Sequence, residues 1–204
     1  MKDAKIFGLV VAGGQSQRMG GTDKAFLKLG NVTLVEACCG RLGRQVRSIL
    51  VNSNAPPDAF TALGLEAHAD FIPGYLGPLA GILTGLEWAK ERWGDEAWVV
   101  SVAVDTPFFP EDLTARLFAT AQDGKFPAAI ASSGGRAHPV FGIWSVSLAE
   151  KLRHSLTVLH MRKVMAWTQS IPCGVAEWPS EPIDPFTNIN TSHDLDLVKA
   201  RQLP

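Results

Sequence analysis

The sequence predicts an α/β protein built on a doubly wound, Rossmann-like and mostly parallel sheet. Two continuous apolar runs, residues 6–11 and 99–104, are typical of central parallel strands that helices cover on both faces. A third strand-like segment, residues 48–52, lies between them, together with two segments of helical apolar spacing, residues 34–46 and 78–93. Strands that alternate with helices in this way indicate a doubly wound sheet.

The second part of the chain continues the α/β pattern with shorter elements. A helix is expected over residues 110–122, which begin at a proline-rich turn. Residues 128–132 and 140–144 are strand candidates joined by a glycine-containing turn, and residues 147–167 are expected to form one or two helices. A turn-rich segment then leads to a C-terminal helix that is expected to begin near Thr191.

Composition narrows the class of ligand and the compartment. The 204 residues contain no repeat, linker or low-complexity tract, so a single domain over residues 1–204 is expected. With 19 basic and 20 acidic residues, the chain has no general attraction for nucleic acid or for an anionic membrane, and an anionic ligand must be held locally. There is no signal-peptide pattern and no apolar stretch of about 20 residues. The three cysteines have neither disulfide nor metal-ligand spacing, so we expect a cytoplasmic protein.

A glycine-rich segment directly follows the first apolar run. Residues 10–24 have the sequence VVAGGQSQRMGGTDK, in which glycines allow backbone N–H groups to approach phosphate oxygens and Arg18 and Lys24 supply positive charge. Ligands of open α/β sheets bind outside the carboxyl ends of the strands, where this segment lies. It lacks the Gly-Lys-Ser/Thr of a P-loop and the Gly-x-Gly of a dinucleotide fingerprint. The segment therefore predicts a nucleotide site of another kind, and the alternative is a turn that binds nothing.

Asp105 ends the second apolar run and is followed by Thr106 and Pro107. A carboxylate at the carboxyl end of a buried strand, on the same sheet edge as the glycine-rich segment, is well placed to hold Mg²⁺ against triphosphate oxygens. The alternative is an aspartate that caps the turn before Pro107. We expect Asp105 to be the metal ligand.

The segment Ala-Gly-Gly-x-Ser-x-Arg-Met-Gly followed by Asp-Lys resembles the signature loop of the molybdenum cofactor guanylyltransferases, within the wider nucleotidyltransferase family. Sugar-phosphate nucleotidyltransferases usually have Gly-Thr-Arg-Leu where this chain has residues 16–19. Four further segments match the family in the expected order: Gly77-Pro78-Leu79-Ala80-Gly81, Asp105-Thr106-Pro107, His138-Pro139 and Asn188-Ile189-Asn190-Thr191. The resemblance spans nearly the whole chain and implies a fold of the nucleotide-diphospho-sugar transferase type.

The resemblance also implies an activity. It is the Mg²⁺-dependent transfer of GMP from GTP to the terminal phosphate of molybdopterin or molybdenum cofactor, with release of pyrophosphate and formation of the guanine dinucleotide cofactor. Residues 1–125 would then be a nucleotide-binding half and residues 126–204 an acceptor-binding half. Other proteins of cofactor biosynthesis or molybdoenzyme maturation are expected partners, whereas nucleic acid and membranes are not.

The residues that match the family's functional positions form three sets. Catalysis is assigned to Arg18, Lys24 and Asp105. Nucleotide binding is assigned to Val11, Ala12, Gly13, Gly14, Lys24, Asn52, Asp70 and Asp105. Acceptor binding is assigned to His138, Asn188 and Asn190. Taken without the resemblance, Asn52 and Asp70 are also common turn formers, and His138 is expected to position the acceptor or to be structural, because an ionised phosphate needs no general base.

Two other functions remain open at this point. A cytidylyltransferase acting on the same pterin is the nearer one, but such relatives tend to have Ala-Ala-Gly where this chain has Ala12-Gly13-Gly14, and the smaller glycine leaves room for a purine. The second is a nucleotide-binding protein of the same fold without catalysis, since a fold does not imply a function. The presence of Arg18, Lys24 and Asp105 together favours an enzyme.

Overall fold

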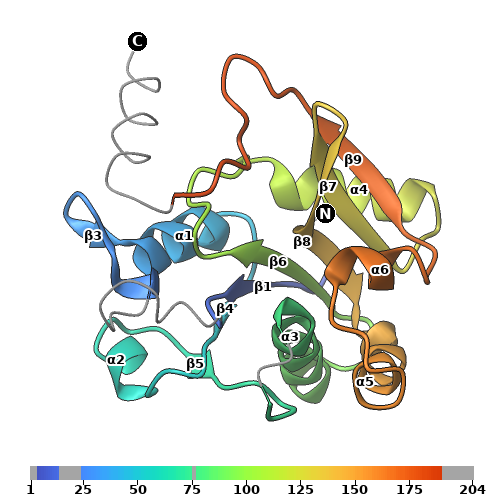
Figure 1. Cartoon of the computed structure of the whole chain (residues 1–204), viewed down its shortest axis with the longest axis horizontal. Helices are drawn as coiled ribbons and strands as arrows, with labels where there is room; N and C mark the ends of the chain where they lie inside the picture. Colours follow the sequence, from blue (N-terminus) through green and yellow to red (C-terminus); the bar gives the residue numbers. More distant parts are fainter. Residues whose placement is uncertain (1–3, 14–23, 75–76, 190–204) are drawn as a thin grey trace.

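One continuous sheet runs through the molecule. The structure, a computed structural model, describes residues 4–13, 24–74 and 77–189. The seven strands are arranged in the order β5-β4-β1-β6-β8-β7-β9, and β2 and β3 form a separate small ribbon (Figure 1). Gly14, Arg18, Asn190 and the expected C-terminal helix lie outside the described residues.

The first four strands in the chain's main sheet are parallel. They are β1 (Ile6–Val11), β4 (Ile49–Asn52), β5 (Ala67–His68) and β6 (Trp98–Ala103). Val11 pairs with Asn52 on one side and with Ala103 on the other, so these strands end at nearly the same level. The segments that follow them therefore meet at one edge of the sheet, as the sequence predicts.

The other side of the sheet is mixed. It consists of β7 (Ala128–Ser133), β8 (Arg136–Ser145) and β9 (Gly174–Trp178). β8 runs antiparallel to both β6 and β7, whereas β9 runs parallel to β7. The tight turn between β7 and β8 brings Ser133 and His138 close to each other, which matters for the site below.

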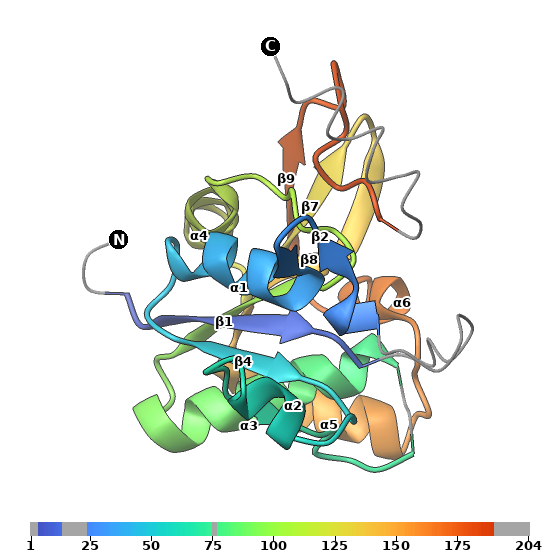
Figure 2. The ribbon, with the colours of Figure 1, turned by 90° about the vertical axis from the view of Figure 1, so that its left-hand side faces the viewer.

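Helices cover both faces of the sheet, which confirms the doubly wound architecture (Figure 2). Alternate residues of β1 supply two separate cores: Ile6 and Val10 belong to one, and Phe7, Leu9 and Val11 belong to the other. The first core is closed by α1 (Leu34–Gly43) and α4 (Leu113–Asp123), and the second by α3 (Pro78–Trp93), α5 (Ala149–Thr157) and α6 (Val164–Thr168). The short elements are α2 (Asp58–Thr61), β2 (Lys28–Leu29), β3 (Val32–Thr33) and the 3-10 turns Lys24–Phe26 and Val146–Leu148.

Local chemistry explains where the helices that flank the site begin. Thr33 and Glu36 form a capping box at the start of α1, in which each side chain accepts from the other residue's backbone N–H. Gly77 has a φ of 76° directly before α3, a conformation that favours glycine, and Pro78 takes the first helical position, where no N–H is required. Both motifs thus have a structural reason independent of any ligand.

Several predicted boundaries need correction. The helix expected over residues 34–46 ends at Gly43, and the one expected from residue 110 begins at Leu113, because Pro110, Glu111 and Asp112 form a preceding turn. The expectation of one or two helices over residues 147–167 is confirmed, because α5 and α6 form there, with a 3-10 turn before them. None of the helices in the described residues is both long and apolar enough to span a membrane.

Candidate active site

A cleft of about 690 Å³ lies at the carboxyl edge of the sheet. Its lining includes the end of β1 and the next residues, Val11, Ala12 and Gly13, as well as the end of β6 with Asp105. The opposite side is formed by the first part of β8, residues 136–141, and by a late loop, residues 184–188, of which all but Pro185 line the cleft. Segments distant in the sequence therefore converge on one concave surface, which is the usual form of a small-molecule site.

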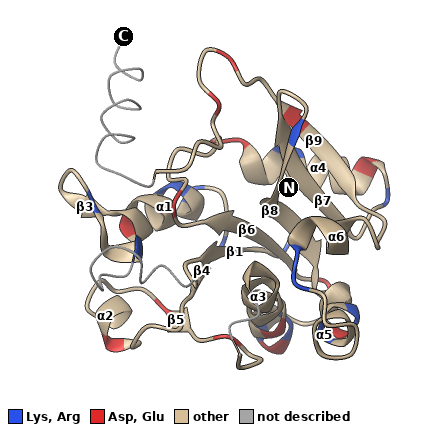
Figure 3. Ribbon diagram, in the orientation of Figure 1, with Lys and Arg blue, Asp and Glu red and all other residues tan. Residues whose placement is uncertain are grey.

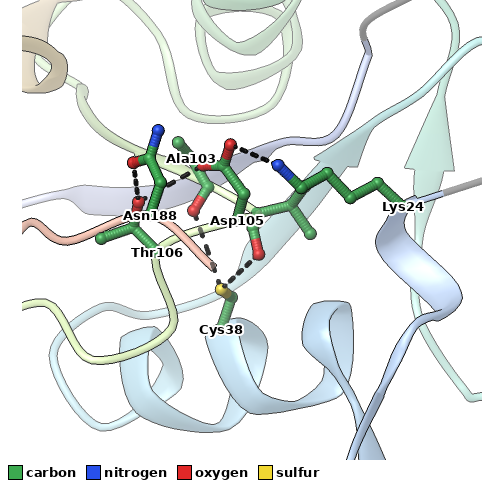
Figure 4. A network of polar contacts seen from close by, with 7 residues as sticks. Lys24, Cys38, Ala103, Asp105, Thr106 and Asn188 are labelled. Atoms are coloured by element: carbon green, nitrogen blue, oxygen red, sulfur yellow. Dashed lines mark hydrogen bonds and ion pairs between the residues drawn. The ribbon is translucent and has the colours of Figure 1, made fainter. Parts of the chain in front are cut away.

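Lys24 and Asp105 form an ion pair in this cleft. The Lys24 Nζ donates to Asp105 Oδ2 at 2.9 Å, and the two side chains are 20% and 23% exposed (Figure 4). Both residues were assigned to catalysis from the sequence. The structure brings them together: Lys24 begins the 3-10 turn Lys24–Phe26, and Asp105 follows β6. A cation and a carboxylate at this distance suit a site for a metal ion and phosphate groups, since each can exchange its partner for one of these ligands.

The late loop is tied to the residue that follows β6. The Ile189 N–H donates to the Asp105 carbonyl oxygen at 2.6 Å, and the Thr106 Oγ1 donates to Asn188 Oδ1 at 2.8 Å. Figure 4 shows the contact between Thr106 and Asn188 beside the ion pair. Asn188 thus lines the cleft next to Asp105, and its amide carbonyl is held by a completely buried hydroxyl. The sequence did not indicate Thr106 as an anchor, because it stands in the variable position of Asp-x-Pro.

Cys38 of α1 lies beneath the same turn. Its thiol donates to the carbonyl oxygen of Val104 at 3.4 Å and contacts that of Ala103 at 3.8 Å. Burial, then the neighbouring Cys39, then Asp105 raise the pKa of the Cys38 thiol well above its ordinary value. This neutral thiol packs in the core and acts as a weak hydrogen-bond donor.

Asn52 and Asp70 form a second polar group at this edge of the sheet, but neither is among the described residues that line the cleft. The Asn52 Nδ2 donates to Asp70 Oδ1 at 3.0 Å, and Asn54 Nδ2 donates to Asp70 Oδ2 at 2.9 Å. The Asp70 N–H donates in turn to Asn54 Oδ1 at 3.0 Å. Two amides therefore hold one carboxylate, and Asn54, a further residue of this group, was missed because an asparagine after a strand is also a common turn former.

The burial of Asn52 explains a glycine of the Gly-Pro-Leu-x-Gly segment. Asn52 is 1% exposed, and a Cβ on Gly81 of α3 would overlap with Asn52 Oδ1 and lie 3.0 Å from its Cγ. A Cβ on Gly13 would lie 3.2 Å from the same oxygen. Asn52 is thus packed between two glycines and acts on Asp70, rather than facing the cleft.

His138 belongs to the cleft wall on the side of β8. Its Nε2 lies 2.7 Å from Ser133 Oγ, which also donates to Asp184 Oδ1 at 2.9 Å. Its ring stacks on Phe186 with centroids 4.6 Å apart. Burial lowers the pKa of His138, and nearby Asp184 opposes this effect. Ser133 and Asp184 were not identified from the sequence, because residues 51 positions apart carry no shared local pattern.

The charges outside the cleft have no common sign. Figure 3 shows Lys and Arg interspersed with Asp and Glu over the described part of the chain. This agrees with the net charge of −1 and with local rather than global attraction of an anionic ligand.

The described residues can hold a metal ion only in a limited way. They include no group of three or more His, Cys, Asp or Glu side chains arranged to bind a metal. Mg²⁺, however, is usually bound by one or two carboxylates together with substrate phosphates and water. Asp105, partly exposed in the cleft, fits that form of binding.

Comparison of the sequence with known proteins finds similarity over most of the chain. Residues 8–171 match the family model of the MobA-like NTP transferase domain. A molybdenum cofactor guanylyltransferase of Nitrobacter hamburgensis is 42% identical over 188 residues, which cover 92% of this chain and 90% of that protein. One from Mesorhizobium japonicum is 43% identical over 193 residues, which cover 93% of this chain and 92% of that protein.

Solved structures share the fold. Molybdopterin-guanine dinucleotide biosynthesis protein A of Archaeoglobus fulgidus superposes with a TM-score of 0.71 at 20% identity, covering 96% of this chain and 97% of that one. A 4-diphosphocytidyl-2C-methyl-D-erythritol synthase of Anaerococcus prevotii gives a TM-score of 0.69 at 12% identity, covering 97% and 96%. At these identities the likeness concerns the fold, which is that of the nucleotide-diphospho-sugar transferase type.

Proposed function

The chain belongs to the family of MobA-like NTP transferase domains, and from this premise we propose that it transfers GMP from GTP to the terminal phosphate of molybdopterin or molybdenum cofactor. The observation that carries the proposal is the identity above 40% with molybdenum cofactor guanylyltransferases over about nine tenths of both chains. The products are pyrophosphate and the guanine dinucleotide cofactor. The paired Lys24 and Asp105 in the cleft support an enzyme rather than a binding protein.

The proposed reaction is an in-line displacement at phosphorus. An oxygen of the acceptor's terminal phosphate forms a bond to the α-phosphorus of GTP, while the bond from that phosphorus to the pyrophosphate oxygen breaks. Lys24 stabilises negative charge on the departing pyrophosphate, and Arg18, outside the described residues, is proposed to do the same. The attacking phosphate is already ionised at neutral pH, so catalysis consists mainly of positioning and electrostatic stabilisation.

Asp105 is the residue that would hold Mg²⁺. A bound Mg²⁺ supplies charge neutralisation for the phosphate oxygens. In its absence, the Asp105 carboxylate is balanced by the Lys24 ammonium group. When nucleotide phosphates and the metal ion bind, Lys24 would pair with the phosphates and Asp105 with the cation. The ion pair therefore leaves neither charge unpaired in the cleft before the substrate binds.

Selection of guanine is proposed to depend on Asp70. A carboxylate can accept from both N1–H and the 2-amino group of guanine, whereas the Watson–Crick edge of cytosine lacks this pair of adjacent donors. Asn52 and Asn54 each donate to one oxygen of Asp70 and thereby hold the carboxylate in one orientation. Each oxygen keeps further lone-pair capacity for a base.

The acceptor is proposed to bind on the side of β8 and the late loop, where His138 and Asn188 line the cleft. Asn190 is proposed to contribute as well, although it lies outside the described residues. GTP and molybdopterin or molybdenum cofactor are thus the proposed partners, with other proteins of cofactor biosynthesis or molybdoenzyme maturation beyond them. The free thiols Cys38, Cys39 and Cys173 suit the reducing cytoplasm proposed as its compartment.

The test uses GTP labelled at the α-phosphate, purified protein, Mg²⁺ and molybdopterin. We expect label to appear in the dinucleotide product, and unlabelled pyrophosphate to form in equal amount. Parallel reactions with CTP examine the cytidylyl alternative, and reactions without Mg²⁺ examine the metal requirement. Binding of GTP without any transfer to the pterin would contradict the proposal and favour the non-catalytic alternative.

A further inference from the structure

Three polar side chains from different segments form a hydrogen-bond chain behind the acceptor side of the cleft. Ser133 ends β7, His138 lies in β8 and Asp184 belongs to the late loop. The Ser133 Oγ lies 2.9 Å from Asp184 Oδ1 and 2.7 Å from His138 Nε2. Ser133 is 1% exposed, whereas His138 and Asp184 line the cleft.

The direction of these hydrogen bonds follows from the number of protons available. A carboxylate only accepts, so the single hydroxyl proton of Ser133 points to Asp184. The Ser133 oxygen must then accept its second bond, which requires a proton on His138 Nε2. The order Asp–Ser–His differs from that of a hydrolytic triad, and an Nε2 that already carries a proton cannot take one from the serine.

The remaining nitrogen of the ring is left for a ligand. In a neutral imidazole with a proton on Nε2, Nδ1 has a lone pair and can only accept. Among the described residues, no side chain or backbone group forms a hydrogen bond to His138 Nδ1. One face of the ring is fixed by the stack on Phe186, whose N–H also donates to Asp184 Oδ1 at 2.9 Å. Asp184 therefore holds both the hydrogen-bond chain and the aromatic support of the same ring.

We propose that Ser133 and Asp184 are positioning residues that hold His138 with its proton on Nε2, so that Nδ1 accepts a hydrogen bond from an N–H or O–H group of the acceptor substrate. The identity of that substrate as a pterin rests on the proposed function, whereas the hydrogen-bond chain does not. A pterin edge carries N–H donors of the required kind. His138 then recognises a neutral donor group of the acceptor and takes no part in binding the reacting phosphate.

The electrostatic surroundings support a neutral ring. Burial is the largest effect on the pKa of His138 and lowers it. Asp184 and Glu177 act in the opposite direction, Arg136 lowers the pKa further, and the net result is a lowered pKa. At neutral pH the ring therefore remains uncharged, and Nδ1 retains its lone pair.

The first experiment examines the ring in the ligand-free protein. Imidazole ¹⁵N chemical shifts distinguish the two neutral tautomers, and the spectrum of His138→Gln identifies the His138 signals among those of the five histidines. We expect the Nε2–H tautomer in the wild type and a mixture of tautomers in Ser133→Ala. Ser132→Ala is the matched control for the tautomer, because the Ser132 hydroxyl donates to Ala176 O and to Glu177 Oε2 and forms no hydrogen bond with the described His138 ring. An Nδ1–H tautomer in the wild type would overturn the inference.

A second variant covers the case in which Ser133→Ala does not fold. Asp184→Asn keeps a carbonyl oxygen, and the Phe186 N–H requires this oxygen in the position of Oδ1. We expect the Nε2–H tautomer to persist while the pKa of His138 falls, since a carboxylate that raises it is gone. A switch of tautomer in Asp184→Asn, or an unchanged pKa, would contradict the proposed chain.

The kinetic readout separates this inference from the proposed function. Loss of one oriented hydrogen bond should raise the KM for the acceptor by about threefold to tenfold in Ser133→Ala, with the KM for GTP unchanged. Restoration of the acceptor KM by Ser133→Thr would support a role for the hydroxyl itself. An unchanged acceptor KM in Ser133→Ala would overturn the role of Nδ1. A wild type that transfers GMP to no pterin, yet shows the Nε2–H tautomer, would refute the proposed function and leave the hydrogen-bond chain in place.

Discussion

Asp105 and Asp70 follow two parallel strands of the same sheet, yet the protein holds these two carboxylates in opposite ways. Asp105 follows β6 and forms an ion pair with Lys24 at 2.9 Å. Asp70 follows β5 and accepts hydrogen bonds from two neutral amides, those of Asn52 and Asn54. A cation balances the charge of its partner and can be replaced by another cation, whereas amides fix the orientation of a carboxylate and leave its charge in place.

The difference suits two separate tasks at one edge of a sheet. An aspartate that exchanges lysine for a metal ion is suited to phosphate chemistry. An aspartate that keeps one orientation is suited to reading the donor pattern of a base, where geometry decides the selectivity. Asp105→Asn changes the first carboxylate, whereas Gly81→Ala and Asp70→Asn act on the second.

The largest effect is expected from Asp105→Asn. The amide keeps the shape and an oxygen for the Thr106 hydroxyl, which lies 3.3 Å from Asp105 Oδ1, but it removes the charge proposed to hold Mg²⁺. Turnover should fall roughly a hundredfold to a thousandfold or more, with little change in melting temperature. Pyrophosphate release and thermal unfolding should be measured on the same preparation. Near-normal release with a lower melting temperature would instead indicate that Asp105 only caps the turn before Pro107.

A stability effect on the Asp70 side is expected from Gly81→Ala. The new methyl group overlaps with the Asn52 side chain, so Asn52 must move and its hydrogen bond to Asp70 is lost. Overpacking of this kind costs about 1–3 kcal/mol of unfolding free energy, which urea denaturation measures. Gly85→Ala, also in α3, is the control, because its methyl group meets the side chain of Leu9 in β1 and not that of Asn52. Only Gly81→Ala should also weaken the preference for GTP; an equal change in both variants would show that Asn52 does not act on Asp70.

Base preference is the next effect in size. If Asp70 accepts from the guanine edge, GTP should bind at least about tenfold more tightly than CTP, a difference of about 1.4 kcal/mol. Asp70→Asn should reduce this ratio toward one, since the amide presents one acceptor and one donor group where guanine needs two acceptors. Calorimetric titration with both nucleotides tests this directly. Equal affinities in the wild type would refute the guanine assignment without affecting the transferase class.

The sequence allowed the position of the cleft to be predicted, because it follows from a general property of parallel sheets. Apolar runs identified β1 and β6, and the residues after such strands, Gly13 and Asp105, had to meet at one edge. The helices α1, α3 and α4 were predicted because each buries an apolar face, whereas the four-residue helix α2 was not predicted. The strands β5 and β9 were not predicted. β5 has two residues, which are too few for a periodic signal, and β9 is an edge strand in which buried and exposed residues alternate.

The supporting residues could not be predicted from the sequence. Asn54, Thr106, Ser133 and Asp184 act through contacts with residues 5 to 82 positions away, and each is also a common turn or strand-end residue. The resemblance to a family identified Asn52 and Asp70, but only the structure shows that Asn52 contacts Asp70 and does not line the cleft. Local patterns thus predict elements and edges, whereas side-chain pairing depends on the tertiary structure.

The smallest expected effect concerns the alkylation rates of the Cys38 and Cys39 thiols, which serve as a control for the Asp105→Asn variant. Burial raises the pKa of Cys39 to about 12, so at pH 9 only about one Cys39 in a thousand is a thiolate, whereas a thiol of ordinary pKa near 8.5 is mostly ionised. By linkage, the folded state loses stability as the pH rises above about 8.5, because the unfolded thiols release their protons first. Iodoacetamide should therefore label both thiols at least about tenfold more slowly in the native protein than in urea.

Asp105→Asn should leave this protection nearly unchanged. Asp105 does contribute to the raised pKa of Cys38, but burial and Cys39 contribute more. Mass spectrometry of the alkylated peptides at pH 9 gives the rates for wild type and variant. Equal rates would show that the turn above α1 remains folded, so that the lost turnover of Asp105→Asn comes from the lost charge. Rapid labelling of Cys38 in the variant would show instead that Asp105 stabilises the turn. The lost turnover of Asp105→Asn would then follow from a change of structure and not from the lost charge.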